Sequence, residues 1–193
     1  MRSSLSGLIN TAGIVLLQVA TFATAQSVLY DKSRVSCVSR QMNVPVEAQF
    51  KKFTARIAFD PAKPEAGNAQ IEIDVGSFDI DNAEVNDEAK SKPWFDVRAF
   101  PKATFVSSGI KPLGSGRYEA RGQLTIKGRT ADVTAPFTYK ESAGNGVFEG
   151  AFSIRRLQYN IGEGAWKDTD TVADDVQIKF SIFVARNVPA AKK

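Results

Sequence analysis

Apolar and polar residues alternate along most of the chain beyond residue 33. Neighbouring residues of a β-strand point to opposite faces of its sheet, so a period of two predicts strands that bury one face and expose the other. In one such stretch Ala55 and Ile57 alternate with Thr54 and Arg56. The pattern predicts about eight strands, at residues 34–40, 52–60, 69–75, 103–107, 118–126, 133–139, 148–154 and 176–184.

Turn-forming residues separate these stretches, and only residues 82–91 look helical, with Asn82 as the expected N-cap. Short connections favour strands that pair with their neighbours in sequence. Closing such a sheet hides every apolar face and removes both edges. We therefore predict an all-β fold, an eight-stranded antiparallel up-and-down barrel with one short helix. Reversals are expected at Asp60-Pro61, Gly114-Ser115-Gly116, Lys127-Gly128-Arg129 and Gly144-Asn145-Gly146.

One segment, residues 92–105, breaks the alternation with aromatic residues set around two prolines. Pro93 and Pro101 stop a helix or a central strand from continuing through their positions. The segment is therefore expected to form a plug or lid at one end of the barrel and to lead into a strand near Ala103. Its aromatic residues are Trp94, Phe95, Phe100 and Phe105.

The interior of an eight-stranded barrel can be filled by side chains or can hold one slender ligand. The residues expected to point inward mix large side chains with small ones such as Ala120 and Gly122. The pattern does not distinguish a solid core from a hollow barrel.

The two ends of the chain differ in character from its middle. Residues 1–25 resemble a secretory signal peptide, with Arg2 before an apolar stretch at 14–20 and the small residues Ala23-Thr24-Ala25 before Gln26. This predicts export through a cleaved signal, to the periplasm. Residues 26–187 are expected to form one domain, and residues 188–193 a loose tail.

The chain lacks the residues that most catalytic and metal sites use. It contains no histidine and one cysteine, Cys37, so an intramolecular disulfide is excluded. The acidic stretch 168–175 has Val172 and Ala173 where a calcium loop needs an oxygen ligand and a glycine. We expect a non-catalytic protein without a metal or cofactor.

The charged residues suggest one candidate polar contact. The formal net charge is +4, but basic and acidic residues are mixed along the chain, which disfavours nucleic-acid binding. Arg155 and Arg156 are adjacent and should point to opposite faces. One of them could hold a phosphate or polar head group at the barrel mouth, and a surface salt bridge is the alternative.

A series of short motifs, taken in order, resembles the YceI-like family of exported, lipocalin-like barrels that bind polyisoprenoid lipids. Asn160 stands where relatives usually have glycine, but asparagine tolerates the left-handed conformation and the turn should survive. Histidines that many relatives carry near the first strand are absent. The motifs are Phe59-Asp60-Pro61, Ile71-Glu72-Ile73-Asp74, Ser77, Trp94-Phe95-Asp96-Val97, Phe100-Pro101-Lys102-Ala103-Thr104-Phe105, Gly122-Gln123-Leu124-Thr125-Ile126-Lys127-Gly128 and Arg156-Leu157-Gln158-Tyr159-Asn160-Ile161-Gly162.

The resemblance implies a carrier or reservoir that encloses a polyprenyl chain, or an isoprenoid quinone such as ubiquinone, in a hydrophobic tunnel. We expect as partners this lipid and a membrane surface or membrane redox protein, and we expect the protein to be a monomer or homodimer. The alternative is a solid barrel that acts through its surface on a membrane redox protein. The expected ligand-binding residues are Val35, Cys37, Phe53, Ala55, Ile57, Ile71, Ile73, Trp94, Phe95, Phe100, Phe105, Leu124, Ile126, Phe137, Phe152, Arg156 and Phe180.

Overall fold

The computed structural model describes residues 25–142 and 144–185. Residues 1–24 of the expected signal peptide and the expected tail at 188–193 lie outside the described residues.

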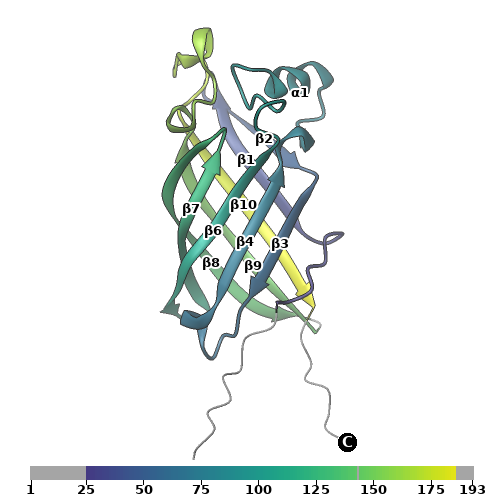
Figure 1. Ribbon diagram of the computed structural model, residues 1–193, viewed down its shortest axis with the longest axis vertical. Coiled ribbons are helices and arrows are strands. Elements are labelled where there is room, and N and C mark those ends of the chain that lie inside the picture. The colour runs from purple at the N-terminus through teal and green to yellow at the C-terminus, as the bar shows by residue number, and fades with distance from the viewer. Residues whose placement is uncertain (1–24, 143, 186–193) are drawn as a thin grey trace, which may run out of the picture.

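The described residues form one curled antiparallel sheet with a barrel-like shape (Figure 1). Its strands follow the order β3-β4-β6-β7-β8-β9-β10-β1-β2-β5, so most strands pair with their neighbours in sequence. The predicted all-β, up-and-down antiparallel fold with one helix is confirmed. The strands are β1 (Arg34–Gln41), β2 (Val44–Phe50), β3 (Phe53–Ala58), β4 (Asn68–Asp74), β5 (Phe78–Asp79), β6 (Lys102–Gly114), β7 (Arg117–Ile126), β8 (Arg129–Ser142), β9 (Asn145–Arg155) and β10 (Asp175–Ala185).

Within the described ranges the strands number ten rather than the predicted eight. The two extra strands are β2 and β5. Strand β2 was not predicted because it contains Pro45 and because the turn before it has no glycine. In that turn Met42 and Asn43 have φ values of 46° and 65°. A two-residue hairpin turn of this kind usually contains glycine. Strand β5 has only two residues, too few for a periodic pattern.

Backbone hydrogen bonds outside the main strand pairs connect the edge strand β3 to β10. At one end, the amide of Gln26 donates to the carbonyl of Ile57 on β3 at 2.7 Å. The amide of Ala185 on β10 donates to Ser27 at 2.7 Å. The segment that precedes β1 therefore lies between β3 and β10 and joins them.

The predicted helix and turns are confirmed. Helix α1 (Ala83–Lys90) begins after Asn82, whose side-chain oxygen accepts a hydrogen bond from the amide of Val85 at 3.1 Å. It lies beyond the strand ends at one end of the barrel (Figure 1). Short 3₁₀ helices complete the described structure: η1 (Pro64–Ala66), η2 (Val75–Ser77), η3 (Arg156–Tyr159) and η4 (Gly164–Lys167).

The half of the barrel away from α1 is solid. Phe59 lies at the centre of a group of aromatic rings, with centroids 5.1 Å from Tyr118, 6.0 Å from Phe137 and 5.3 Å from Phe148. Buried aliphatic residues surround this group, and it fills the space between the strands. A second buried cluster, which includes Leu124, lies toward the end that carries α1.

Candidate functional site

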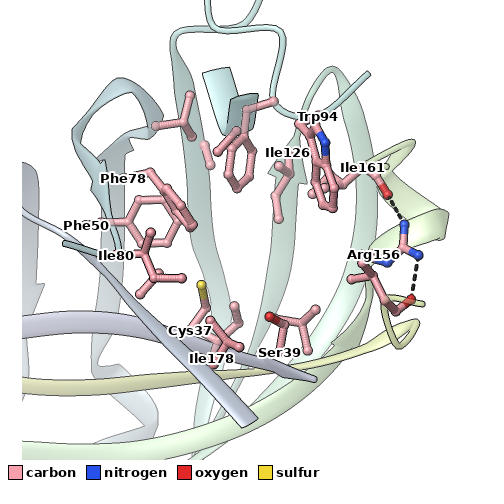
Figure 2. A pocket seen from close by; sticks show the side chains of 18 of the residues that line it. Cys37, Ser39, Phe50, Phe78, Ile80, Trp94, Ile126, Arg156, Ile161 and Ile178 are labelled. Atoms are coloured by element: carbon pink, nitrogen blue, oxygen red, sulfur yellow. Dashed lines mark hydrogen bonds between the residues drawn. The ribbon is translucent and has the colours of Figure 1, made fainter. Parts of the chain in front are cut away.

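The half of the barrel nearer α1 contains a cavity of about 790 Å³, within the range of sites that enclose small ligands. Most of its lining is aliphatic or aromatic, as Figure 2 shows for part of it. Strand residues from β1, β2, β4, β5, β6, β7, β9 and β10 form its walls, and the solid half of the barrel lies beyond it.

The cavity reaches the surface beside α1. Its exposed lining residues are Gln41 at the end of β1 and Glu84, Val85, Asp87 and Glu88 on the helix. We call this set the mouth. Its position places an opening between the β1–β2 hairpin and α1.

The expected aromatic plug forms part of the cavity wall. Phe95 packs edge-on against Phe50, with ring centroids 6.0 Å apart, and lies 5.7 Å from Phe78. Trp94 lies 5.4 Å from Trp166. The amide of Phe95 donates to the carbonyl of Ala89 at 3.0 Å, which ties the segment to the end of α1.

Cys37 is half-buried on β1, and its sulfur points into the cavity (Figure 2). Burial raises the pKa of its thiol to about 12, with a smaller contribution from the negative charge of Glu47, while a hydrogen bond to the Ala48 backbone opposes the rise. The apolar walls therefore keep the sulfur as a neutral thiol.

Arg156 is buried, with 2% of its surface exposed, and it borders the cavity. Its Nε donates to the carbonyl of Ala173 at 3.0 Å. Its two terminal nitrogens donate to carbonyls of the loop after β9: Ile161 at 2.9 Å (Figure 2), Gly162 at 3.3 Å, Trp166 at 2.7 Å and Val172 at 2.7 Å.

This arrangement engages all the N–H groups of the Arg156 guanidinium in fixing the loop. Burial lowers its pKa, and the charge of Asp174 partly offsets that effect. The guanidinium also lies 5.8 Å from the centre of the Trp94 ring. Arg155 is exposed, so the two arginines point apart as expected. The expected head-group contact does not fit this geometry, because Arg156 has no N–H left to donate.

Lys127 makes a second set of contacts that fixes the loops at this end. Its ammonium donates at 2.8 Å to the carbonyls of Lys92 and Asn160 and to the carboxylate of Glu163. The hydrogen bond from Lys127 lowers the pKa of Glu163. Asn160 adopts the left-handed conformation that the sequence required of it, with φ 55°.

The residues expected to bind ligand divide between the two halves of the barrel. Phe100 lines neither half, because its ring packs against Gly128 in the turn between β7 and β8. Those in the cavity lining are Val35, Cys37, Ile73, Trp94, Phe95, Leu124, Ile126, Phe152 and Arg156. Those in or against the solid core are Phe53, Ala55, Ile57, Ile71, Phe105, Phe137 and Phe180.

Sequence reasoning missed a large part of the cavity wall. Val46, Ala48 and Phe50 belong to β2, and their own alternation with polar residues was the signal that could have found them. Ile161, Trp166 and Val172 come from the loop after β9, where no period applies. The remaining missed residues are Gln41, Phe78, Ile80, Glu84, Val85, Asp87, Glu88 and Ala89. Six other lining residues lie on the inward faces of the predicted strands: Ser39, Val75, Ala103, Ile154, Val176 and Ile178.

Within residues 25–142 and 144–185, no cluster of three or more histidine, cysteine, aspartate or glutamate side chains could hold a metal ion. In the same part of the chain, no helix has the length and apolar character that crossing a membrane requires.

A family model for the YceI-like domain matches residues 27–184. The chain belongs to the YceI-like family. The UPF0312 protein of Pseudomonas savastanoi pv. phaseolicola is 32% identical over 94 residues, which cover 49% of each chain. A UPF0312 protein of Pseudomonas putida strain W619 is 33% identical over 60% of this chain and 57% of its own. This YceI-like chain thus spans about half the length of the curated relatives it matches.

Solved structures of other proteins share the fold. BcnA of Burkholderia cenocepacia is 50% identical, with a TM-score of 0.80 over 81% of this chain and 99% of BcnA. The YceI protein of Campylobacter jejuni has a TM-score of 0.68 at 21% identity, covering 74% of this chain and 86% of its own. A polyisoprenoid binding domain from Saccharophagus degradans has a TM-score of 0.66 at 16% identity, covering 84% of this chain and 98% of its own.

Proposed function

We propose that this protein is a non-catalytic binding protein that encloses an isoprenoid lipid, either a polyprenyl chain or an isoprenoid quinone such as ubiquinone. The observation that carries the proposal is the cavity, which is apolar along its walls and opens at one end. The polyisoprenoid binding domain from Saccharophagus degradans has the same fold and supports this choice of ligand. We further propose that the protein works after export, in the periplasm.

The physical chemistry of such ligands favours a carrier or reservoir. Burying a prenyl tail from water would contribute about 0.8 kcal/mol per CH₂, which for a long tail exceeds the practical affinity limit of about 20 kcal/mol. Prenyl lipids start in a membrane, however, where the tail is already out of water. The free energy of moving the lipid from the membrane into the protein therefore depends on tail shape, on a preformed cavity and on polar contacts at the mouth.

The solid half of the barrel limits how the tail can lie. The rings around Phe59 occupy the interior beyond the cavity, so a tail that enters from the mouth cannot run the full length of the barrel. A long prenyl chain must fold back within the cavity or extend from the mouth.

The alternative of a solid barrel that acts only through its surface fits one half of the molecule. It leaves the hollow half without a role, and the hollow half is the one lined by Trp94 and Phe95 of the YceI-like motif series. The lipid-binding proposal accounts for both halves.

A titration with short-chain ubiquinone tests the proposal. Both tryptophans of the chain, Trp94 and Trp166, line the cavity, so a bound quinone should quench their fluorescence. Cys37 and Ile178 are paired across β1 and β10 and both line the cavity. The double variant Cys37→Phe/Ile178→Phe fills this space and should weaken binding at least about tenfold, or about 1.4 kcal/mol.

Cys37→Ser is the matched control, because it changes the same position and adds no volume. It should bind the quinone as the native protein does. Equal quinone affinity of the filled variant and the control, with both shown to be folded by circular dichroism, would show that the quinone binds outside this cavity. Absence of any saturable quenching in the native protein would count against lipid binding itself.

A further inference from the structure

The charges around the cavity are unequally distributed. Three lining residues carry carboxylates, and all three lie on α1 at the mouth: Glu84, Asp87 and Glu88. All three are exposed. Among the lining residues that the structure describes, the one basic side chain is Arg156.

The two buried cations near the cavity have no donor to offer a ligand. Arg156 directs its guanidinium at five backbone carbonyls, at distances of 2.7 to 3.3 Å. Lys127 directs its ammonium at two carbonyls and the Glu163 carboxylate, and it does not line the cavity. At the mouth, Lys90 pairs with Asp87 at 3.0 Å and so offsets one of the three carboxylates.

A phosphate or pyrophosphate head group at this mouth would meet Glu84 and Glu88, which form no ion pair within the described residues, and no free basic donor from the lining. Like charges a few ångströms apart repel one another even in water, and more strongly where the surroundings are less polar. An uncharged head group avoids this repulsion. The oxygen of Ser39 appears among the side chains around the cavity in Figure 2. Ser39 and Gln41 can each donate to a hydroxyl or carbonyl oxygen and can each accept from a hydroxyl group.

We infer that the mouth selects isoprenoid lipids with an uncharged head group, a prenol or a quinone, against prenyl phosphates with the same tail. The inference rests on the proposed function, since it concerns which lipid the cavity accepts. It makes the acidic face of α1 a specificity determinant.

The test compares two probes with one tail, farnesol and farnesyl phosphate. Competition with the short-chain quinone, followed by tryptophan fluorescence at low ionic strength, gives both affinities. We expect farnesol to bind about tenfold or more tightly than the phosphate, a difference of about 1.4 kcal/mol. High salt should narrow the ratio, because it screens the exposed carboxylates.

The variant Glu84→Gln/Asp87→Asn/Glu88→Gln should bring the affinity for farnesyl phosphate to within about threefold of that for farnesol, chiefly by tightening the binding of the phosphate. The control, Asp31→Asn/Glu65→Gln/Glu149→Gln, changes the net charge equally. Its residues are exposed and lie outside the cavity lining. It should keep the native preference.

Each outcome has a distinct meaning. Equal binding of the two probes by the native protein would overturn the selectivity and leave lipid binding standing. A native preference that survives in the α1 variant, or that disappears in the control as well, would overturn the role of the mouth. Failure of both probes and of the quinone would overturn the proposed function together with this inference.

Discussion

At the scale of single residues, the end of the barrel that carries the cavity depends on two buried cations. Lys127 binds carbonyl oxygens of Lys92 and Asn160, which are far apart in the sequence, and Arg156 binds five carbonyl oxygens within the loop after β9. The loops at this end have no ladder of their own, so these side chains supply the hydrogen bonds that strands would provide. The cations shape the wall of the cavity without being free to contact a ligand.

Replacing Arg156 with Met should lower the free energy of unfolding by about 3–5 kcal/mol, because it leaves several buried carbonyls without a donor. Arg155→Met is the matched control, since Arg155 is adjacent and exposed, and it should change stability by less than about 0.5 kcal/mol. Urea unfolding measures both. Equal stability of the two variants would contradict the role given to Arg156.

The thiol of Cys37 should react slowly with iodoacetamide at neutral pH. Its pKa is raised to about 12, chiefly by burial, and the thiolate is the reactive form. The rate should therefore keep rising with pH well beyond the range in which an ordinary cysteine levels off. Ser108→Cys in a Cys37→Ser background places an exposed thiol for comparison. Matching pH profiles for the two thiols would contradict the burial of Cys37.

At the scale of elements, α1 is held over the cavity through β5. The carboxylate of Asp79 accepts a hydrogen bond from Asn86 of α1 at 2.7 Å and forms an ion pair with Lys51. The amide of Asp81 donates to the same carboxylate at 3.1 Å. These contacts, with that from Lys51 the largest, lower the pKa of Asp79 to about 2.

Asp79→Asn should loosen α1, which hydrogen exchange of the helix amides would detect. A lowered pKa stabilises the fold above the unfolded value near 3.8, and this contribution disappears as the pH falls toward about 2. The melting temperature of the variant should thus fall below that of the native protein at neutral pH and approach it near pH 2. Asp87→Asn, which removes an exposed carboxylate from the same helix, is the control. A difference in melting temperature between the native protein and the variant that stays constant with pH would contradict the role of Asp79.

The sequence allowed prediction of the elements that have a strong period or a recognisable cap. The long strands, the reversals and the Asn82 cap are all present as predicted. The failures have physical causes. The turn between β1 and β2 was not predicted, because Met42 and Asn43 adopt the left-handed conformation where glycine is usual. Strand β5 was not predicted because two residues are too few to show an alternating pattern. Alternation shows that Phe152 and Phe137 both point inward, but it carries no information on which of them borders empty space.

At the scale of the whole molecule, the barrel combines a packed half with a hollow half. Phe59→Ala in the packed half should cost about 3–5 kcal/mol of stability, because it empties the centre of the aromatic group. Phe152→Ala should cost less, about 1–2 kcal/mol, because Phe152 already borders the cavity. Chemical denaturation compares the two. Equal losses would show that the halves are packed alike.

The most direct test of the central claim, that the cavity holds an isoprenoid lipid, is mass spectrometry of lipids extracted from protein purified from its native host. We predict a prenol or isoprenoid quinone bound to the native protein and to Cys37→Ser, and little or none bound to Cys37→Phe/Ile178→Phe. Native protein that carries no prenyl lipid, or a filled variant that carries as much as the native protein, would contradict the account.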